Sequence, residues 1–160
     1  MNEPTQLDWA RLAAFLDGEG SIRVARQIKN KATQMRWPIY TLLVAVDNTD
    51  LRLMSWLTSL FGGTIDDKCH KNRAATGRRQ LYRWRATKDE RRVVLENCMP
   101  YFILKRKQAE LGLSMLKTTS GKRGKRPPEK VMLQESICSE LNALNLTRGK
   151  NKQATLAMVQ

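Results

Sequence analysis

The stretch that decides the fold runs from Leu12 to Gly20 and reads Leu-Ala-Ala-Phe-Leu-Asp-Gly-Glu-Gly. Its large apolar side chains stand at helical spacing, so we expect a helix over residues 7–16 that is closed by the glycines Gly18 and Gly20. Residues 21–29 then alternate between polar and apolar side chains, which predicts a half-buried strand. The quoted stretch is therefore a junction between a helix and a strand.

One side of this helix carries small residues. Ala10, Ala14 and Gly18 recur at every fourth position, and Ala13 lies beside them. A stripe of small side chains lets two helices approach closely, backbone against backbone. We therefore expect this side of the helix to face a second helix.

The helix also ends with two acids, because Asp17 and Glu19 flank Gly18. Negative charge is unfavourable at the C-terminal end of a helix, whose dipole favours cations there. A bound divalent metal would reverse this, and Mg²⁺ prefers hard carboxylate and carbonyl oxygens, with phosphates often completing its shell. The alternative is an ordinary helix end with two surface acids, and the residues alone leave both interpretations open.

The rest of the chain predicts pairs of strands between helices. The stop signals are Gly62-Gly63 and Pro100, and Thr87-Lys-Asp-Glu90 has the pattern of a capping box. The strand over 37–47 is apolar on both faces, so its buried face is left open. The expected elements are that strand, a helix over 50–61, strands over 64–70 and 80–87, and helices over 87–98, 105–116 and 129–144.

This order predicts an α+β fold, α-β-β-α-β-β-α with further C-terminal helices. Neighbouring strands joined as hairpins imply an antiparallel four-stranded sheet with helices on one face. The length of 160 residues suits one domain, which we place at residues 1–145, with a basic linker at 118–128 before the last helix. Residues 146–160 form a tail whose order the sequence does not predict.

The composition points to a polyanion as partner. Lys and Arg number 29 against 15 Asp and Glu, which gives a formal net charge of +14. Nucleic acid is the obvious partner for such a small basic domain, although charge does not distinguish DNA from RNA. Membrane binding is disfavoured, because no run of 18 apolar residues could span a bilayer and no basic helix has a broad apolar face.

Other classes of site and compartment are also disfavoured. The single histidine, His70, excludes sites built from several histidines, and three widely spaced cysteines argue against a disulfide framework or a Cys-only zinc site. The N-terminal residues lack the pattern of a secretory signal peptide. We therefore expect a reducing intracellular compartment, either an organelle (chloroplast or mitochondrion) or the cytoplasm of a bacterium or archaeon.

Alternation along the strands predicts which side chains face a nucleic acid. In the expected sheet the polar faces of all four strands point the same way, and the major groove of DNA is wide enough to admit β-strands. Arginine suits guanine, glutamine suits adenine, and lysine suits bases or phosphates, although a slip of one residue would reverse the faces. The candidate DNA-binding residues are Arg23, Gln27, Lys29, Thr41, Lys68, His70, Arg83 and Arg85.

The quoted stretch resembles a known signature. LAAFLDGEG is similar to the LAGLIDADG motif of the homing endonucleases, with Ala14 in place of the usual glycine and Glu19 in place of the commoner aspartate. The order of elements, the segment from Pro100 to Ala109 and a late helix ending at 143–145 are also similar to the single-motif members. The resemblance covers residues 7 to about 145.

The resemblance implies a homodimer, because single-motif members pair their motif helices. The metal ligands that it implies are Glu19 and the backbone carbonyl of Gly18, with Mg²⁺ as the cofactor. Mn²⁺ is expected to substitute, and Ca²⁺ to bind without supporting cleavage. The implied dimer interface comprises Ala10, Ala13, Ala14 and Asp17, and Asp17 is expected to brace the helix end by hydrogen bonds rather than to bind metal.

Three more positions are carried over by the resemblance. Asn48 falls where the family has a polar residue that holds the water network, although Asp47 or Asp50 takes this place if the register differs. Arg52 and Lys105 fall where basic residues stabilise charge on the scissile phosphate. The alternative for both is ordinary surface charge.

The function implied is that of an intron-encoded endonuclease. We expect metal-dependent hydrolysis of both strands of a long, pseudo-palindromic DNA target, across the minor groove, leaving 3′ overhangs. One alternative is a protein on the same scaffold that does not cut, either an RNA-splicing maturase or a DNA-binding regulator. Another is a general RNA- or ribosome-associated basic protein, which explains the charge but not the motif.

Overall fold

The computed structural model describes residues 3–27, 38–67, 77, 79–87, 89–119 and 127–157. Lys29, Lys68 and His70 therefore lie outside the described residues. The chain divides into two compact units. Unit 1 comprises residues 1–22 and 43–109, and unit 2 comprises residues 23–42 and 110–160.

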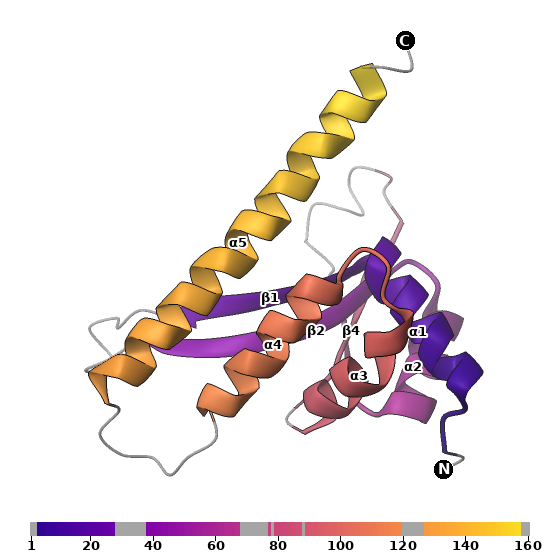
Figure 1. Cartoon of the computed structure of the whole chain (residues 1–160). Coiled ribbons are helices and arrows are strands. Elements are labelled where there is room, and N and C mark those ends of the chain that lie inside the picture. Colours follow the sequence, from indigo (N-terminus) through magenta and orange to yellow (C-terminus); the bar gives the residue numbers. More distant parts are fainter. Residues whose placement is uncertain are drawn as a thin grey trace. The chain divides into compact units, whose positions relative to one another are not determined.

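Helix α1 (Gln6–Gly18) opens unit 1 (Figure 1). It begins one residue before the predicted start, because Thr5 and Asp8 form a capping box. The Asp8 N–H donates to Thr5 Oγ1 over 3.3 Å, and the Thr5 N–H donates to Asp8 Oδ2 over 3.0 Å. At the other end only glycine fits at Gly20, because a Cβ there would lie 2.5 Å from the Cα of Leu16.

The next two helices are α2 (Leu51–Phe61) and α3 (Glu90–Cys98). The α2 helix ends at Gly62, whose φ of +68° is one that L side chains rarely adopt. The α3 helix begins later than the predicted residue 87, and only half of the expected capping box forms. The Glu90 carboxylate accepts from the N–H and the hydroxyl of Thr87, without the reciprocal bond.

A short 3₁₀ helix, η2 (Met99–Tyr101), follows α3 and contains Pro100. The chain then enters α4 (Arg106–Thr119), which continues to the start of the predicted linker. Within unit 1, α1, α3 and η2 pack against one another (Figure 1). Their buried side chains include Leu12, Leu16, Leu95 and Cys98, none of which has exposed surface.

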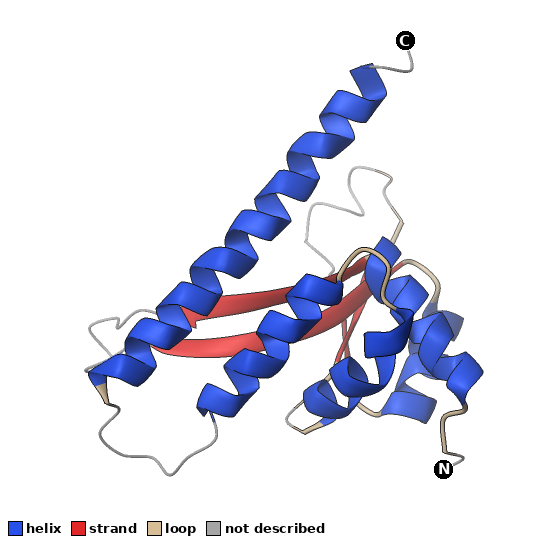
Figure 2. Cartoon of the chain, in the orientation of Figure 1, coloured by secondary structure: helices blue, strands red, loops and turns tan. Residues whose placement is uncertain are grey.

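Four strands form one antiparallel sheet (Figure 2): β1 (Gly20–Gln27), β2 (Ile39–Asn48), β3 (Thr64–Asp67) and β4 (Tyr82–Arg85). Their order is β1-β2-β4-β3, so each predicted hairpin pair consists of neighbours and β2 joins β4. In this register Trp84 lies opposite both Val46 and Ile65. The predicted α+β fold with an antiparallel four-stranded sheet is confirmed.

Burial settles which face of β2 points to the core. Tyr40, Leu42, Val44 and Val46 are all at most 3% exposed, whereas the opposite face is mostly half-buried. Trp84 continues this inner face in unit 1, where its Nε1 donates to the Gly62 carbonyl over 2.7 Å. Arg83 and Arg85 alternate with Trp84, so they lie on the outer face, as the strand pattern predicts.

In unit 2 the main feature is α5 (Pro128–Ala157), a single helix of 30 residues that extends beyond the predicted end at 144 (Figure 1). Two buried polar residues link the helices of this unit, since Gln134 Nε2 donates to Thr118 Oγ1 over 3.0 Å. Glu135 accepts the hydroxyl of Tyr40 and pairs with Arg26 at 3.3 Å. Within the described ranges every helix is too short or too polar to cross a bilayer.

Candidate active site and nucleic-acid interface

The two acids at the end of α1 have different surroundings. Asp17 is only 7% exposed, and its carboxylate accepts three backbone N–H groups: those of Ile103 at 2.8 Å, Leu104 at 3.2 Å and Lys105 at 2.9 Å. These bonds fasten the turn that precedes α4 to the last turn of α1. Asp17 therefore acts as a brace within unit 1, and its oxygens are occupied.

Lys105 supplies a cation at the end of α1. Its side chain is buried, and Nζ donates to the carbonyls of Leu16, Asp17 (3.2 Å) and Gly20 (2.5 Å). A cation at a helix C-terminus interacts favourably with the dipole and with carbonyls that have no partner within the helix. The sequence suggested that a bound metal would offset the two acids there, with two surface acids as the alternative, and Lys105 already offsets part of that charge.

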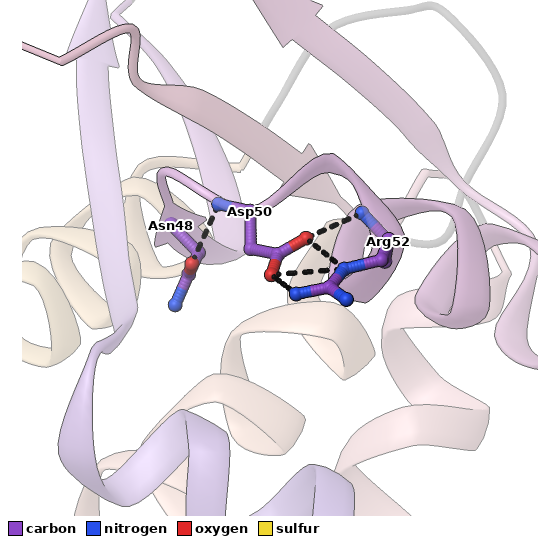
Figure 3. Close-up of polar contacts among 3 residues, drawn as sticks. All are labelled: Asn48, Asp50 and Arg52. Carbon is purple, nitrogen blue, oxygen red and sulfur yellow. Dashed lines mark hydrogen bonds and ion pairs between the residues drawn. The ribbon is translucent and has the colours of Figure 1, made fainter.

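Glu19 is exposed, and Asn48 holds its carboxylate from the end of β2. Asn48 Nδ2 donates to Glu19 Oε2 over 2.6 Å. The other end of the amide is also fixed, because Asn48 Oδ1 accepts the N–H of Asp50 over 2.9 Å (Figure 3). The amide therefore has a single orientation, with its donor group directed at Glu19.

Asp50 in turn holds Arg52 at the start of α2 (Figure 3). The Asp50 carboxylate accepts the N–H of Arg52 over 2.9 Å and pairs with its guanidinium at 2.6 Å. The hydrogen bonds from the Arg52 side chain, followed by that from its backbone, lower the pKa of Asp50 from 3.8 to about 2. The guanidinium of Arg52 is held by Asp50, and because the side chain is 92% exposed it remains accessible to a ligand.

The structure thus brings together three of the four predicted catalytic residues, Glu19, Asn48 and Lys105, and links Arg52 to Asn48 through Asp50. Among the described residues, no three His, Cys, Asp or Glu side chains are close enough to hold a metal ion. A single chain therefore offers the exposed carboxylate of Glu19 and the carbonyl of Gly18. Hard oxygens of this kind fit Mg²⁺, which usually retains waters and binds phosphates besides one or two carboxylates.

The residues predicted at a dimer interface separate into two sets. Ala13 has no exposed surface and Asp17 is buried, so both face the interior of unit 1. Ala14 is exposed and Ala10 is half-buried. Gly18 is exposed, with open space where a Cβ would stand. Only this second set offers surface to another molecule.

The predicted DNA-binding residues also fall into two groups. In unit 2, Arg23 and Gln27 are exposed and Thr41 is half-buried. In unit 1, Arg83 is bonded to Asp47 and Arg85 to Asp66. The sequence does not predict these carboxylates as partners of the arginines, because the pairing depends on the register of β2, β3 and β4.

No protein-family model and no curated protein sequence matches this chain. Solved structures do match. The homing endonuclease I-CvuI, solved with its target in the presence of Ca, superposes with a TM-score of 0.67 at 21% identity, covering 87% of this chain and 82% of I-CvuI. The chain has the homing-endonuclease fold.

Two further homing endonucleases share this fold over most of their length. I-TnaI has a TM-score of 0.60 at 17% identity, with 93% of this chain and 99% of I-TnaI covered. The archaeal, intron-encoded I-Vdi141I, solved with DNA, has a TM-score of 0.55 at 11% identity, with 88% and 98% covered. At these identities the three proteins share the homing-endonuclease fold with this chain.

Proposed function

We propose that this protein is a site-specific endonuclease that hydrolyses both strands of a long, pseudo-palindromic DNA target and leaves 3′ overhangs. The observation that carries the proposal is the exposed carboxylate of Glu19 at the end of α1, oriented by Asn48. A protein that only binds DNA has no need of a fixed, exposed carboxylate, which would repel phosphate.

Glu19 and the carbonyl of Gly18 would hold the divalent ion, with Mg²⁺ as the physiological metal. Bound there, the ion would activate water and stabilise the leaving 3′ oxygen. Mn²⁺ would substitute, and Ca²⁺ would bind without supporting cleavage. Asn48 fixes one oxygen of Glu19, and Asp50 fixes Asn48, so the carboxylate is preorganised before DNA arrives.

The two cations have different proposed roles. The guanidinium of Arg52 is exposed and anchored on Asp50, so it can contact a phosphate oxygen directly. The ammonium of Lys105 is buried against three carbonyls, so it stabilises charge on the phosphate through its field and without contact. Lys105 also offsets the negative end of α1, which would otherwise repel the DNA backbone.

We further propose that the active protein is a homodimer. One chain supplies one exposed acid at the end of α1, Glu19, whereas cutting two strands needs two such centres. The exposed side of α1 (Ala10, Ala14 and Gly18) offers a close approach to a second helix. Beside it, the turn held by Asp17 exposes Ile103 (87%) and Leu104 (59%), an apolar pair suited to burial against another copy. Two-fold symmetry then accounts for a pseudo-palindromic target.

The proposal is tested with a randomised double-stranded DNA library biased toward palindromes. The protein is incubated with the library in Mg²⁺, and the ends of cut molecules are sequenced beside a Glu19→Gln sample. Ends at a two-fold-symmetric site that are absent with Glu19→Gln support the endonuclease. Retention of DNA by both proteins without any cut ends would leave a DNA-binding protein. Retention of RNA alone, in a parallel binding assay with RNA, would leave a maturase.

A further inference from the structure

The outer face of the sheet in unit 1 carries a row of alternating acids and arginines across three strands. Asp47 on β2 and Asp66 on β3 both lie directly opposite Arg83 on the central strand β4. Arg85, two residues along β4, extends toward Asp66. We call these four side chains the charge ladder.

Each arginine in the charge ladder is held by one aspartate, Arg83 through two hydrogen bonds and Arg85 through one hydrogen bond and an ion pair. Arg83 donates from Nε to Asp47 Oδ1 over 2.5 Å and from Nη2 to Asp47 Oδ2. In Arg85, Nη2 donates to Asp66 Oδ1 over 3.1 Å, whereas Nε lies 2.7 Å from Asp66 Oδ2 as an ion pair without hydrogen-bond geometry. A guanidinium has five N–H donors in a planar fork, so the Nε side of each fork meets a carboxylate while the Nη1 side is left for a ligand.

The charge ladder carries no net charge, since it pairs two arginines with two aspartates. In a chain with a formal charge of +14, these arginines are therefore poorly suited to general attraction of phosphate. Their side chains are partly buried, at 17% exposed for Arg83 and 43% for Arg85. The Arg83 fork is thus fixed before binding and Arg85 is restrained by its pairing with Asp66, which reduces the entropy lost when they meet a ligand.

A fixed fork suits the edge of a base. Arginine reads guanine through two parallel hydrogen bonds to O6 and N7 in the major groove, which demands a defined orientation. We propose that Asp47 and Asp66 are specificity-determining residues, which position Arg83 and Arg85 to read base pairs, with guanine preferred, in each half of the target. This rests on the proposed function only in requiring that the protein binds double-stranded DNA.

The aspartates also contribute to discrimination by repulsion. A carboxylate near DNA lowers affinity for every sequence, and only the correct base pair compensates by accepting from the arginine that the carboxylate holds. Removing the carboxylate should therefore strengthen binding to random DNA while weakening discrimination. Arginines that bind phosphate would give a uniform gain without that loss.

The test compares Asp47→Asn and Asp66→Asn with wild-type protein and with a control, Asp67→Asn. Asp67 follows Asp66 on β3, so it faces the opposite side of the sheet. Its carboxylate accepts a hydrogen bond from Gln80 rather than from an arginine of the ladder. All three changes remove one negative charge. Binding sites are selected from a randomised double-stranded library in Ca²⁺ at fixed salt, and base preferences at each position are counted beside the affinity for random DNA.

We expect the base preference of each ladder variant to fall about tenfold at one or two base pairs per half-site. Asp67→Asn should retain those preferences, while all three variants gain similar affinity for random DNA. Unchanged preferences in both ladder variants would overturn the inference and leave the endonuclease proposal intact. Failure of the wild-type protein to retain any double-stranded DNA would overturn both.

A second variant separates positioning from stability. Arg83→Lys keeps the charge and an ion pair with Asp47 but removes the fork, so it should lose the same base preference as Asp47→Asn. The melting temperature of each variant is measured alongside. A fall in melting temperature with base preferences retained would show that the charge ladder only stabilises the sheet.

Discussion

Acidic side chains are held in two different ways at the end of α1 and in the charge ladder. At the end of α1, Asp17 accepts backbone N–H groups and Glu19 accepts the amide of Asn48. In the charge ladder, Asp47 and Asp66 accept guanidinium groups. A neutral donor adds no formal charge, whereas a guanidinium cancels that of the acid.

This difference indicates which carboxylates of this basic protein can bind a metal ion. A carboxylate oriented by a neutral amide keeps its formal charge for an ion from solution, and this describes Glu19. A carboxylate paired with arginine is better suited to positioning its partner. Asp50, beside the candidate active site, belongs to the second kind, because it pairs with Arg52.

The largest effect is expected from Glu19→Gln, which removes the exposed charge and keeps the shape. Cleavage of the selected target should fall by about a thousandfold or more, because the metal would lose its carboxylate ligand. Affinity for the same DNA in Ca²⁺ should change little. Single-turnover rates and binding isotherms measure the two, with Glu96→Gln on the exposed face of α3 as a control.

Asp17→Asn tests the second acid of the motif, which should act on stability. The amide cannot accept all three backbone N–H groups equally well, so the free energy of unfolding should fall by about 3 kcal/mol. Denaturant unfolding measures this. The exposed Glu96→Gln should stay within about 0.5 kcal/mol of wild type. A stability of Asp17→Asn equal to that control would contradict the role of Asp17 as a brace.

Ile103→Glu tests whether two chains form a dimer through the end of α1 and the adjacent turn. Ile103 is 87% exposed, so the single chain should remain folded while a charge enters the proposed interface. We expect the dissociation constant of the dimer to rise at least about tenfold, as measured by sedimentation. Leu133→Glu, at an exposed position of α5, should leave the dimer intact. Equal behaviour of the two variants would exclude this turn from the interface.

The smallest effect concerns the protonation of Asp50. Its pKa is lowered to about 2, chiefly by hydrogen bonds from Arg52, so its stabilising contribution is present above pH 4 and is lost as the pH falls toward 2. Arg52→Ala should return the pKa toward 3.8. Carboxyl chemical shifts followed by NMR titration report it directly, and an unchanged pKa in Arg52→Ala would remove Asp50 from the class of arginine-paired acids.

Much of the fold followed from local signals. Alternation predicted the inner residues of β1, and Gly62 marked the end of α2, because a backbone with positive φ leaves few other choices. Thr5 and Asp8, three residues apart, form the capping box that sets the start of α1. The end of α5 could not be predicted, since residues 146–157 have no apolar pattern that favours a helix over a tail.

The candidate site was less predictable, because it depends on contacts between distant parts of the chain. The motif and its resemblance indicated Glu19, but burial alone shows that Ala13 faces the interior of unit 1. Lys105 was expected to act on phosphate, whereas its bonds to α1 carbonyls follow from the packing of a turn more than 80 residues away. The charge ladder could not be predicted without the register of the three strands that carry it.

The most direct test of the central claim locates the metal ion itself. Crystals of the protein with its selected DNA would be grown in Mn²⁺, and anomalous scattering would give the position of the ion. We predict a peak at about 2.1 Å from a carboxylate oxygen of Glu19, between the protein and a DNA phosphate. A peak on Asp17, Asp47 or Asp66, with none at Glu19, would contradict the account.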